Sequence, residues 1–168
     1  QAKNRLSAPG GQAIKALLGE QIAFLNRQID AIEAACDDLI TSIEGLPSLH
    51  KALIAVPGLG PATVRTLIAC LPELGSLSAK QASSLSGLAP HPRQSGQTDR
   101  HRSMTGGRPT LRRALFMAAL AAARAHPNLK TFYKRLTDAG KPPKLAIAAV
   151  ARKLLVIANA IAKTAHKD

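Results

Sequence analysis

The sequence has no tryptophan and few other aromatic residues, with one tyrosine and three phenylalanines among 168 residues. Proteins that bind single-stranded nucleic acid by base stacking need several aromatic side chains on one surface. A base-stacking platform is therefore not supported. Tyr133, a candidate nucleophile by its chemistry, lies in the middle of an expected helix and is interpreted as a packing residue.

Cysteine is equally rare. Cys36 and Cys70 are isolated and have no CxxC spacing, so we interpret both as buried apolar positions rather than a disulfide or a metal pair. The five histidines also lack metal-ligand spacing. No signal peptide is visible, and the longest apolar run, residues 114–123, is too short to span a bilayer. We expect a cytoplasmic protein that does not associate with a membrane.

Acidic residues are scarce after residue 50, where only Glu73, Asp99, Asp138 and Asp168 occur. Two-metal phosphoryl chemistry needs several carboxylates around one site. The acids of residues 12–45 are expected to face solvent along a helix, and no HExxH, Walker or GxGxxG pattern appears. The sequence thus predicts no metal site and no bound cofactor in this chain.

Positive charge is what the sequence has in excess, with a net charge of +13. Residues 1–50 carry a net charge of −2, whereas residues 51–168 carry 19 Lys and Arg against four acids, a net charge of +15. So basic a region attracts polyanions, and counterion release makes their binding sensitive to salt. Nucleic acid is the predicted partner. An anionic membrane and a basic surface that only aids solubility are the alternatives.

A heptad pattern follows an irregular segment, residues 1–11. Apolar residues separated alternately by four and three positions define this heptad seam: Leu18, Ile22, Leu25, Ile29, Ile32, Cys36, Leu39 and Ile43. The spacing predicts one coiled-coil helix over residues 12–45, ended by Gly45 and Pro47, that pairs with a second copy of the chain. The alternative is an amphipathic helix folded onto its own domain.

Residues 46–168 are predicted to form a compact helical domain, so the expected fold class is all-α. Residues 48–71 resemble a helix-hairpin-helix motif around Pro57-Gly58-Leu59-Gly60-Pro61, which binds the DNA backbone; a purely structural helical hairpin is the rival interpretation. A short helix capped by Ser78 follows, and then a basic loop, residues 87–107, that could contain a short hairpin. C-terminal helices are expected over residues 108–163, and the first is rich enough in alanine for another backbone to pack closely against it.

A possible nucleophile lies in the basic loop. Ser95 is followed by glycine and stands between Arg93 and Arg100, and residues 91–113 contain six arginines and one acid, Asp99. Guanidinium groups orient phosphates and stabilise the charge that builds up during attack on phosphorus. Cleavage of a phosphodiester through a phosphoserine link is chemically sensible there, although Ser-Gly is also an ordinary turn dipeptide.

Several short segments occur in a set order that resembles a known family. They are Ile54-Ala-Val-Pro-Gly-Leu-Gly-Pro61, Ser86-Gly-Leu-Ala-Pro90, Ser95-Gly96, Gly106-Gly-Arg108, Leu111-Arg-Arg-Ala-Leu115, Phe132-Tyr-Lys-Arg-Leu136, Gly140-Lys-Pro-Pro-Lys144 and Arg152-Lys-Leu-Leu155. Residues 50–163 resemble the C-terminal domain of the insertion-sequence transposases numbered 110, 116 and 902. The preceding helix resembles the coiled-coil linker of that family.

The resemblance implies DNA recombination during transposition. Members of the family carry an N-terminal RuvC-like nuclease domain that holds Mg²⁺ on four acids, and their C-terminal domain supplies a catalytic serine. A structured bridge RNA guides the assembly. The family serine corresponds to Ser95, with Ser103 as the rival. The RuvC-like domain is missing from this sequence, so we expect a fragment or a truncated remnant, inactive in transposition alone.

The residues expected to contact nucleic acid are basic side chains and hairpin glycines: Gly58, Gly60, Arg65, Arg93, Arg100, Arg102, Arg108, Arg112, Arg113, Lys144 and Arg152. Two other functions remain as alternatives to catalysis. One is a nucleic-acid-binding module that uses the same surface without catalysis, and the other is a coiled-coil assembly protein whose basic charge is incidental.

Overall fold

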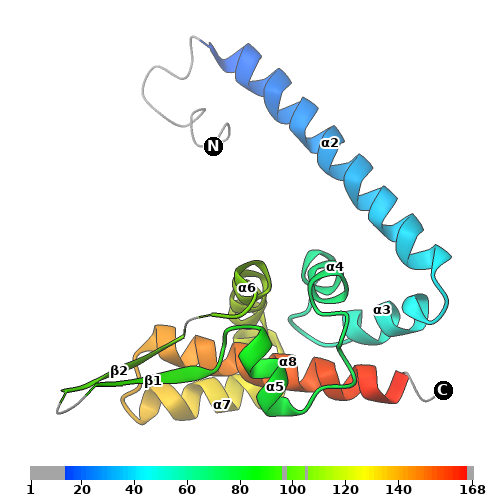
Figure 1. Ribbon diagram of the computed structural model, residues 1–168. Helices are drawn as coiled ribbons and strands as arrows, with labels where there is room; N and C mark the ends of the chain where they lie inside the picture. Colours follow the sequence, from blue (N-terminus) through cyan, green and yellow to red (C-terminus); the bar gives the residue numbers. More distant parts are fainter. Residues whose placement is uncertain (1–13, 96–97, 105, 166–168) are drawn as a thin grey trace. The chain divides into compact units, whose positions relative to one another are not determined.

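A computed structural model describes residues 14–95, 98–104 and 106–165, and between residues 91 and 103 it describes only the backbone. The chain divides into two compact units, residues 1–44 and 45–168. In the described ranges the fold is all-α, as predicted, with seven helices and one two-stranded hairpin (Figure 1). The irregular segment expected over residues 1–11 lies outside the described residues.

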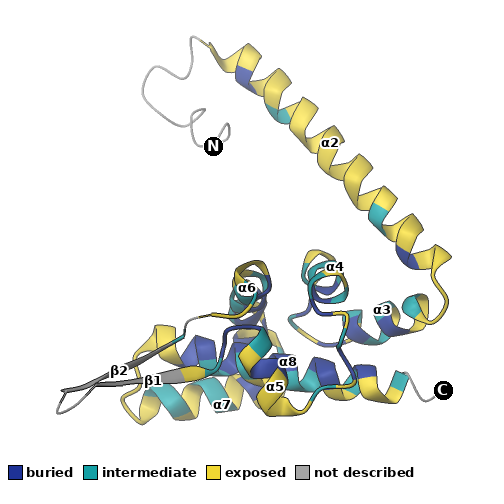
Figure 2. Ribbon diagram, in the orientation of Figure 1, coloured by how far each residue is buried: buried dark blue, intermediate teal, exposed yellow. Residues whose placement is uncertain are grey.

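In the described part of the first unit lies the helix α2, which spans Lys15–Ser42 and agrees closely with the helix predicted over residues 12–45. Figure 2 shows that most of this helix is exposed along its length. In the heptad seam Leu18 is buried, Ile22 and Cys36 are half-buried, and the other five apolar side chains are 45–63% exposed. The seam therefore presents a row of apolar side chains to solvent, and its pairing with a second copy stays a prediction.

The second unit begins with two helices joined by a tight hairpin, α3 (Leu46–Ile54) and α4 (Pro61–Cys70). Gly58 has a φ of 101°, which an L side chain rarely adopts, and Pro61 starts α4 as expected. The next helix, α5 (Ala79–Leu85), is capped by Ser78 in a reciprocal capping box with Gln81. The two helices, the tight turn between them and the helix capped by Ser78 thus occur where the sequence predicted them, and the assignment of a helix-hairpin-helix motif stays a prediction.

A β-hairpin occupies most of the stretch interpreted from the sequence as a basic loop. Strand β1 (Pro90–Ser95) pairs antiparallel with β2 (Thr98–Met104), and the register shifts between His91 and Arg93. Pro92 lies in this irregularity, where a residue without an N–H is tolerated. Both strands are polar and lack the apolar alternation that signals a half-buried strand, which explains why sequence patterns indicated them only weakly.

Three helices complete the unit: α6 (Pro109–Ala125), α7 (Pro127–Asp138) and α8 (Pro143–Ala165). Helix α8 is central and packs against α3, α5, α6 and α7 (Figure 1). By length and composition it could cross a membrane, but more than half of its most apolar stretch is buried inside the protein. Burial of this kind is typical of a core helix in a water-soluble protein.

A buried asparagine fixes the segment between α4 and α5. The Asn159 side chain on α8 accepts a hydrogen bond from the Gly75 N–H at 2.9 Å and donates one to the Leu77 carbonyl at 2.7 Å. Asn159 is only 6% exposed, so both bonds satisfy groups that water does not reach freely. This contact ties the residues that lead into α5 to the core helix.

The burial of the two cysteines differs from the interpretation of the sequence. Both are free thiols, in agreement with the absence of a disulfide pattern, but both are half-buried rather than fully buried. The backbone carbonyl of Cys70 accepts a hydrogen bond from Arg108, because α4 ends beside the chain that leads into α6.

Candidate nucleic-acid interface

The base of the β-hairpin is held by close backbone packing between two glycine-containing segments. Gly87 and Gly107 both have positive φ, and a Cβ built on Gly107 would lie 2.3 Å from the backbone nitrogen of Gly87. The Arg108 N–H donates to the Leu85 carbonyl at 2.8 Å, next to this contact. Glycine is required at both positions because a side chain would separate the two segments.

An ion pair reinforces the same region. The Arg108 guanidinium donates two hydrogen bonds to the Glu73 carboxylate, at 2.7 and 2.8 Å, and a third to the Cys70 carbonyl at 2.8 Å. The hydrogen bond from Arg108, helped by one from the backbone of Glu73 itself, lowers the pKa of Glu73 from 4.5 to about 2. Arg108 therefore links α4 to the start of α6, and its predicted contact with phosphate would compete with this pairing.

Arg112 also has a structural contact. Its guanidinium donates a 2.8 Å hydrogen bond to the Gly106 carbonyl, and it lies 2.5 Å from the position that a Cβ on Gly87 would take. One nitrogen of the guanidinium is thus engaged at the hairpin base. Arg112 also lines a neighbouring pocket, and a guanidinium has donors beyond the one used here.

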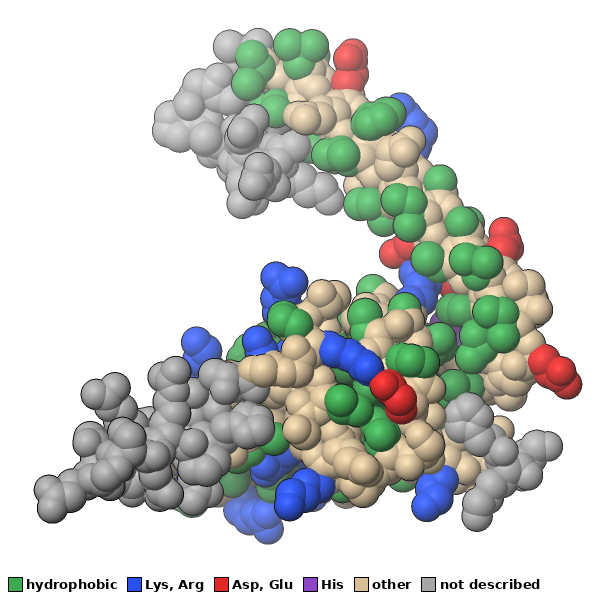
Figure 3. Space-filling view, in the orientation of Figure 1, with side chains coloured by type: hydrophobic (Ala, Val, Ile, Leu, Met, Phe, Trp, Pro, Cys, Tyr) green, Lys and Arg blue, Asp and Glu red, His purple; other side chains and the backbone are tan. Residues whose placement is uncertain are grey.

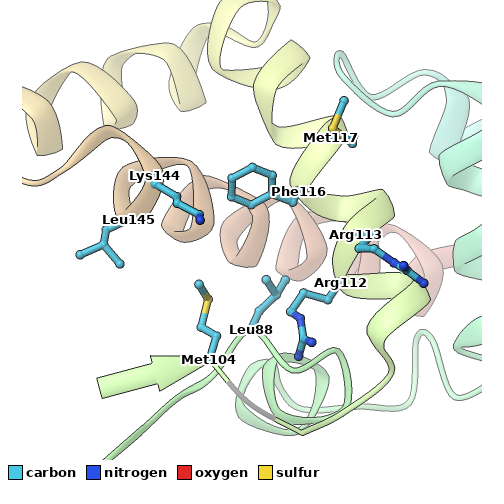
Figure 4. Close-up of a pocket in the computed structure, with 8 residues that line it drawn as sticks. All are labelled: Leu88, Met104, Arg112, Arg113, Phe116, Met117, Lys144 and Leu145. Atoms are coloured by element: carbon cyan, nitrogen blue, oxygen red, sulfur yellow. The ribbon is translucent and has the colours of Figure 1, made fainter. Parts of the chain in front are cut away.

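This α6–α8 pocket has a volume of about 450 Å³ and lies between α6, the start of α8 and the hairpin base (Figure 4). Its lining combines apolar side chains with three cations: Leu88, Met104, Arg112, Arg113, Phe116, Met117, Lys144 and Leu145. In Figure 4 the Phe116 ring lies across the pocket from Leu88 and Met104, with Lys144 on one side and Arg112 on the other. The pocket is apolar inside and positively charged at its rim.

Three further depressions share lining residues with the α6–α8 pocket or with one another, and we refer to the four together as the basic groove. Their volumes are about 140, 500 and 360 Å³. They add further cations to those of the pocket: Lys80, Arg124, Arg152 and Lys153. Among the side chains that the structure describes, no acidic one lines any of the four depressions, so these linings attract an anion.

Basic side chains are visible at several places on the face of the second unit drawn in Figure 3, and acidic ones are few. Aromatic contacts hold some of the cations in place. The Lys153 ammonium lies 4.6 Å from the centre of the Phe132 ring, and the Arg135 guanidinium lies 5.3 Å from it. Such cation–π contacts position a cation without neutralising it.

The strand register relates the predicted nucleophile to two predicted phosphate ligands. Arg93 and Arg100 occupy directly opposite positions in the hairpin, and Ser95 lies opposite Thr98. Ser95 follows Arg93 by two residues, so both belong to the same face of β1. After Thr98, which is directly opposite, the next positions to Ser95 on that face are those of Arg93 and Arg100, a relationship that the sequence order alone did not show.

Apart from Arg108, which pairs with Glu73, the predicted site residues fall into three places in the second unit. Arg112, Arg113, Lys144 and Arg152 line the basic groove. Arg93, Ser95, Arg100 and Arg102 belong to the β-hairpin, where the structure describes the backbone but not the side chains. Gly58, Gly60 and Arg65 lie in the α3–α4 hairpin and on α4, and share no described pocket with the groove residues. Contact of any of them with nucleic acid stays a prediction.

Sequence reasoning missed several residues that line the basic groove, among them Phe116, Met117 and Arg124. A signal for them was present, because Arg112, Phe116, Leu120 and Arg124 are spaced by four residues along α6 and so share one helix face. Among the described residues, no group of three or more His, Cys, Asp or Glu side chains comes together as a metal site would require.

Comparison with known proteins identifies the family. A profile of the transposase IS116/IS110/IS902 family matches residues 50–134. A pilin gene-inverting protein of Moraxella bovis is 32% identical over 152 residues, which cover 88% of this chain and 47% of that protein.

Two Streptomyces coelicolor proteins also match, and each aligns over only part of its own length. An insertion element IS110 uncharacterized protein is 31% identical over 143 residues (83% of this chain, 34% of that protein). A mini-circle putative transposase for IS117 is 32% identical over 138 residues (76% and 32%). This chain thus spans about half or less of the length of the relatives it matches. Because the family profile covers half of the chain, the chain belongs to the IS116/IS110/IS902 family of transposases.

Proposed function

We propose that this chain is the C-terminal part of a DNA recombinase, which grips nucleic-acid backbone through the basic groove and supplies Ser95 as the nucleophile for strand cleavage. The observation that carries the proposal is the register of the hairpin. In this register the Ser95 position shares one face of the hairpin with the directly opposed positions of Arg93 and Arg100. Like charges at directly opposite positions repel in the absence of a ligand. A phosphate between them would remove that repulsion and would lie beside Ser95.

The reaction is a transfer of a phosphoryl group to serine. The Ser95 Oγ bonds to phosphorus and releases its proton, while the bond from phosphorus to the leaving nucleotide oxygen breaks and that oxygen takes up a proton. Arginines at positions 93 and 100 would stabilise the charge on the phosphoryl oxygens during the transfer. The product is a phosphoserine link that a second strand end can attack in the reverse sense.

We expect the activity of the whole protein to depend on regions beyond the residues of this chain. We expect a RuvC-like domain to hold Mg²⁺, which would polarise the reacting phosphate. We also expect a structured bridge RNA to be a partner and the site of action to be cytoplasmic. The pilin gene-inverting and IS117 relatives have names that agree with recombination of DNA.

The α3–α4 hairpin is proposed as a second backbone contact of the helix-hairpin-helix type. The N–H groups of Gly60, which is the N-cap of α4, and of Ala62, in its first turn, have no acceptor within the helix and lie at its N-terminal end. Such N–H groups bind phosphate oxygens, helped by the helix dipole. Gly60 meets no atom within 4 Å of an added Cβ, so its backbone is open to a ligand.

Self-association through α2 is the remaining element of the proposal. Five apolar side chains of the heptad seam are exposed on this helix, and a second copy of α2 would bury them in a coiled coil. A dimer would also bring two copies of the basic domain to one DNA molecule. An assembly protein without catalysis rests on this same observation and is the second candidate function.

A substitution pair tests the catalytic proposal in the protein that includes the RuvC-like domain. Ser95→Ala should abolish strand exchange while nucleic-acid affinity stays within about twofold of wild type, whereas Ser103→Ala, in the same hairpin, should retain exchange. Persistent recombination by Ser95→Ala would rule out the assigned nucleophile. Loss in Ser103→Ala alone would transfer the role to that residue.

A further inference from the structure

We infer that the α6–α8 pocket binds a single unpaired nucleobase of the DNA or RNA strand whose backbone lies in the basic groove. This inference rests on the proposed binding of nucleic acid and adds a specific ligand site to it. The sequence offers no platform for stacking a series of bases, but the fold places one of its three phenylalanines, Phe116, in a pocket ringed by cations.

The chemistry of the lining fits a base attached to a phosphate. The interior is formed by Leu88, Met104, Phe116 and Leu145, which offer an apolar and aromatic surface to a flat ring. A volume of about 450 Å³ lies within the range of roughly 300–1,000 Å³ that is usual for small-molecule sites. The pocket is therefore large enough to hold one base that is turned out of a strand.

The cations at the rim of the pocket would bind the phosphate that is attached to the base. Arg113 and Lys144 are both exposed at the edge of the pocket, and the contacts described for the protein include no ion pair for either. Arg112 retains donors beyond the one that binds Gly106. An apolar peptide helix would leave these three cations unmatched, whereas a nucleotide brings an apolar ring and a negative charge together.

Both methionines of the chain, Met104 and Met117, line this pocket. Met117 is 65% exposed, so a ligand in the pocket can reach this side chain. Methionine is flexible and polarisable, and it is common where a surface must adapt to ligands of different shape. A pocket with two methionines and one phenylalanine suits any of the bases rather than one specific base.

The two methionines provide a direct test with the intact chain. Protein labelled with ¹³C at the methionine methyl groups should give two signals, one for each side of the pocket. Three duplexes are titrated, made once in DNA and once in RNA: fully paired, with one bulged adenine, and with an abasic bulge. We expect the adenine bulge to shift both methyl signals by ring-current effects and to bind at least about fivefold more tightly than the abasic bulge.

Each outcome decides a different claim. If all duplexes bind equally and neither methyl signal distinguishes adenine from the abasic site, the base pocket is wrong while the proposed backbone binding stands. If no duplex binds at all, the proposed function fails as well. A response to DNA bulges alone or RNA bulges alone identifies the strand that supplies the base. Phe116→Ala should remove the preference for adenine, and Phe24→Ala, the same change at an exposed position of α2 outside the heptad seam, should keep it.

Discussion

Gly58 and Ala122 are in such close contact that a Cβ built on Gly58 would lie 2.5 Å from the Cβ of Ala122. The α3–α4 hairpin thus packs its backbone directly on α6, where the row of alanines leaves room for it. Gly58, predicted as a phosphate ligand, has a packing role that does not depend on any ligand.

This contact predicts unequal effects at the two hairpin glycines. Gly58→Ala should lower the free energy of unfolding by about 2–4 kcal/mol, because it combines a positive φ with a steric clash in the core. Gly60→Ala should change the free energy of unfolding by less than about 0.5 kcal/mol, since its φ is −82° and no atom lies nearby. Urea unfolding measures both. Equal destabilisation by the two variants would show that the hairpin does not pack on Ala122.

The Glu73–Arg108 pair predicts a pH dependence of stability. The carboxyl has a pKa of about 2 in the folded protein against a reference value of 4.5, so its contribution is full above pH 4.5. The contribution to stability should disappear as the pH falls toward 2, because the Glu73 carboxyl then becomes protonated in the folded state as well as in the unfolded state. The difference in unfolding free energy between wild type and Glu73→Gln, measured from pH 7 to pH 2, should shrink through that window.

Glu44→Gln, which removes an exposed carboxyl from the first unit, is the matched control and should change stability little. A constant difference between wild type and Glu73→Gln across the whole range would mean that the ion pair does not stabilise the fold. Removing the pair should also loosen the junction between α4 and α6.

The basic groove predicts a measurable change in salt dependence. Arg113→Ala and Lys144→Ala should each weaken binding to duplex DNA regardless of its sequence and reduce the slope of log K against log salt concentration by about 1. Lys163→Ala, which removes an exposed cation near the end of α8 and outside the groove, should leave the slope unchanged. A wild-type affinity that does not respond to salt would favour an assembly protein over a nucleic-acid-binding one.

The exposed seam of α2 predicts self-association of the full chain. Light scattering should give a mass at least twice the 17.6 kDa of one chain, and the combined Ile29→Lys and Ile32→Lys change should reduce it to the monomer. Ala34→Lys, exposed on the opposite face of α2, adds the same type of charge away from the seam and should leave the mass unchanged. A monomeric wild type would contradict the coiled coil.

Local patterns predicted the helices well. The heptad spacing predicted α2, the Ser78 cap predicted α5, and the prolines at the starts of α4 and α8 agreed with the expected boundaries. These features depend on residues close together in the sequence. The all-α fold class and the close approach of a backbone to the alanines of α6 followed from the same kind of reasoning.

Long-range partners could not be predicted in the same way. Nothing in the sequence indicates that Arg108 pairs with Glu73, 35 residues away, or that Asn159 holds Gly75. Similarly, the opposition of Arg93 and Arg100 depends on strand register, and the polar strands carry no apolar alternation from which a register can be read. The basic groove depends on how α6 and α8 pack, so its residues were found only in part.

The central claim is tested most directly by locating the protein–DNA linkage. The protein that includes the RuvC-like domain would be incubated with a nicked substrate that traps the covalent intermediate, and the linked peptide would be sequenced by mass spectrometry. We predict a nucleotide attached to the Ser95 oxygen. A nucleotide attached to Ser103 or Tyr133, or strand exchange without any covalent link, would contradict the assignment.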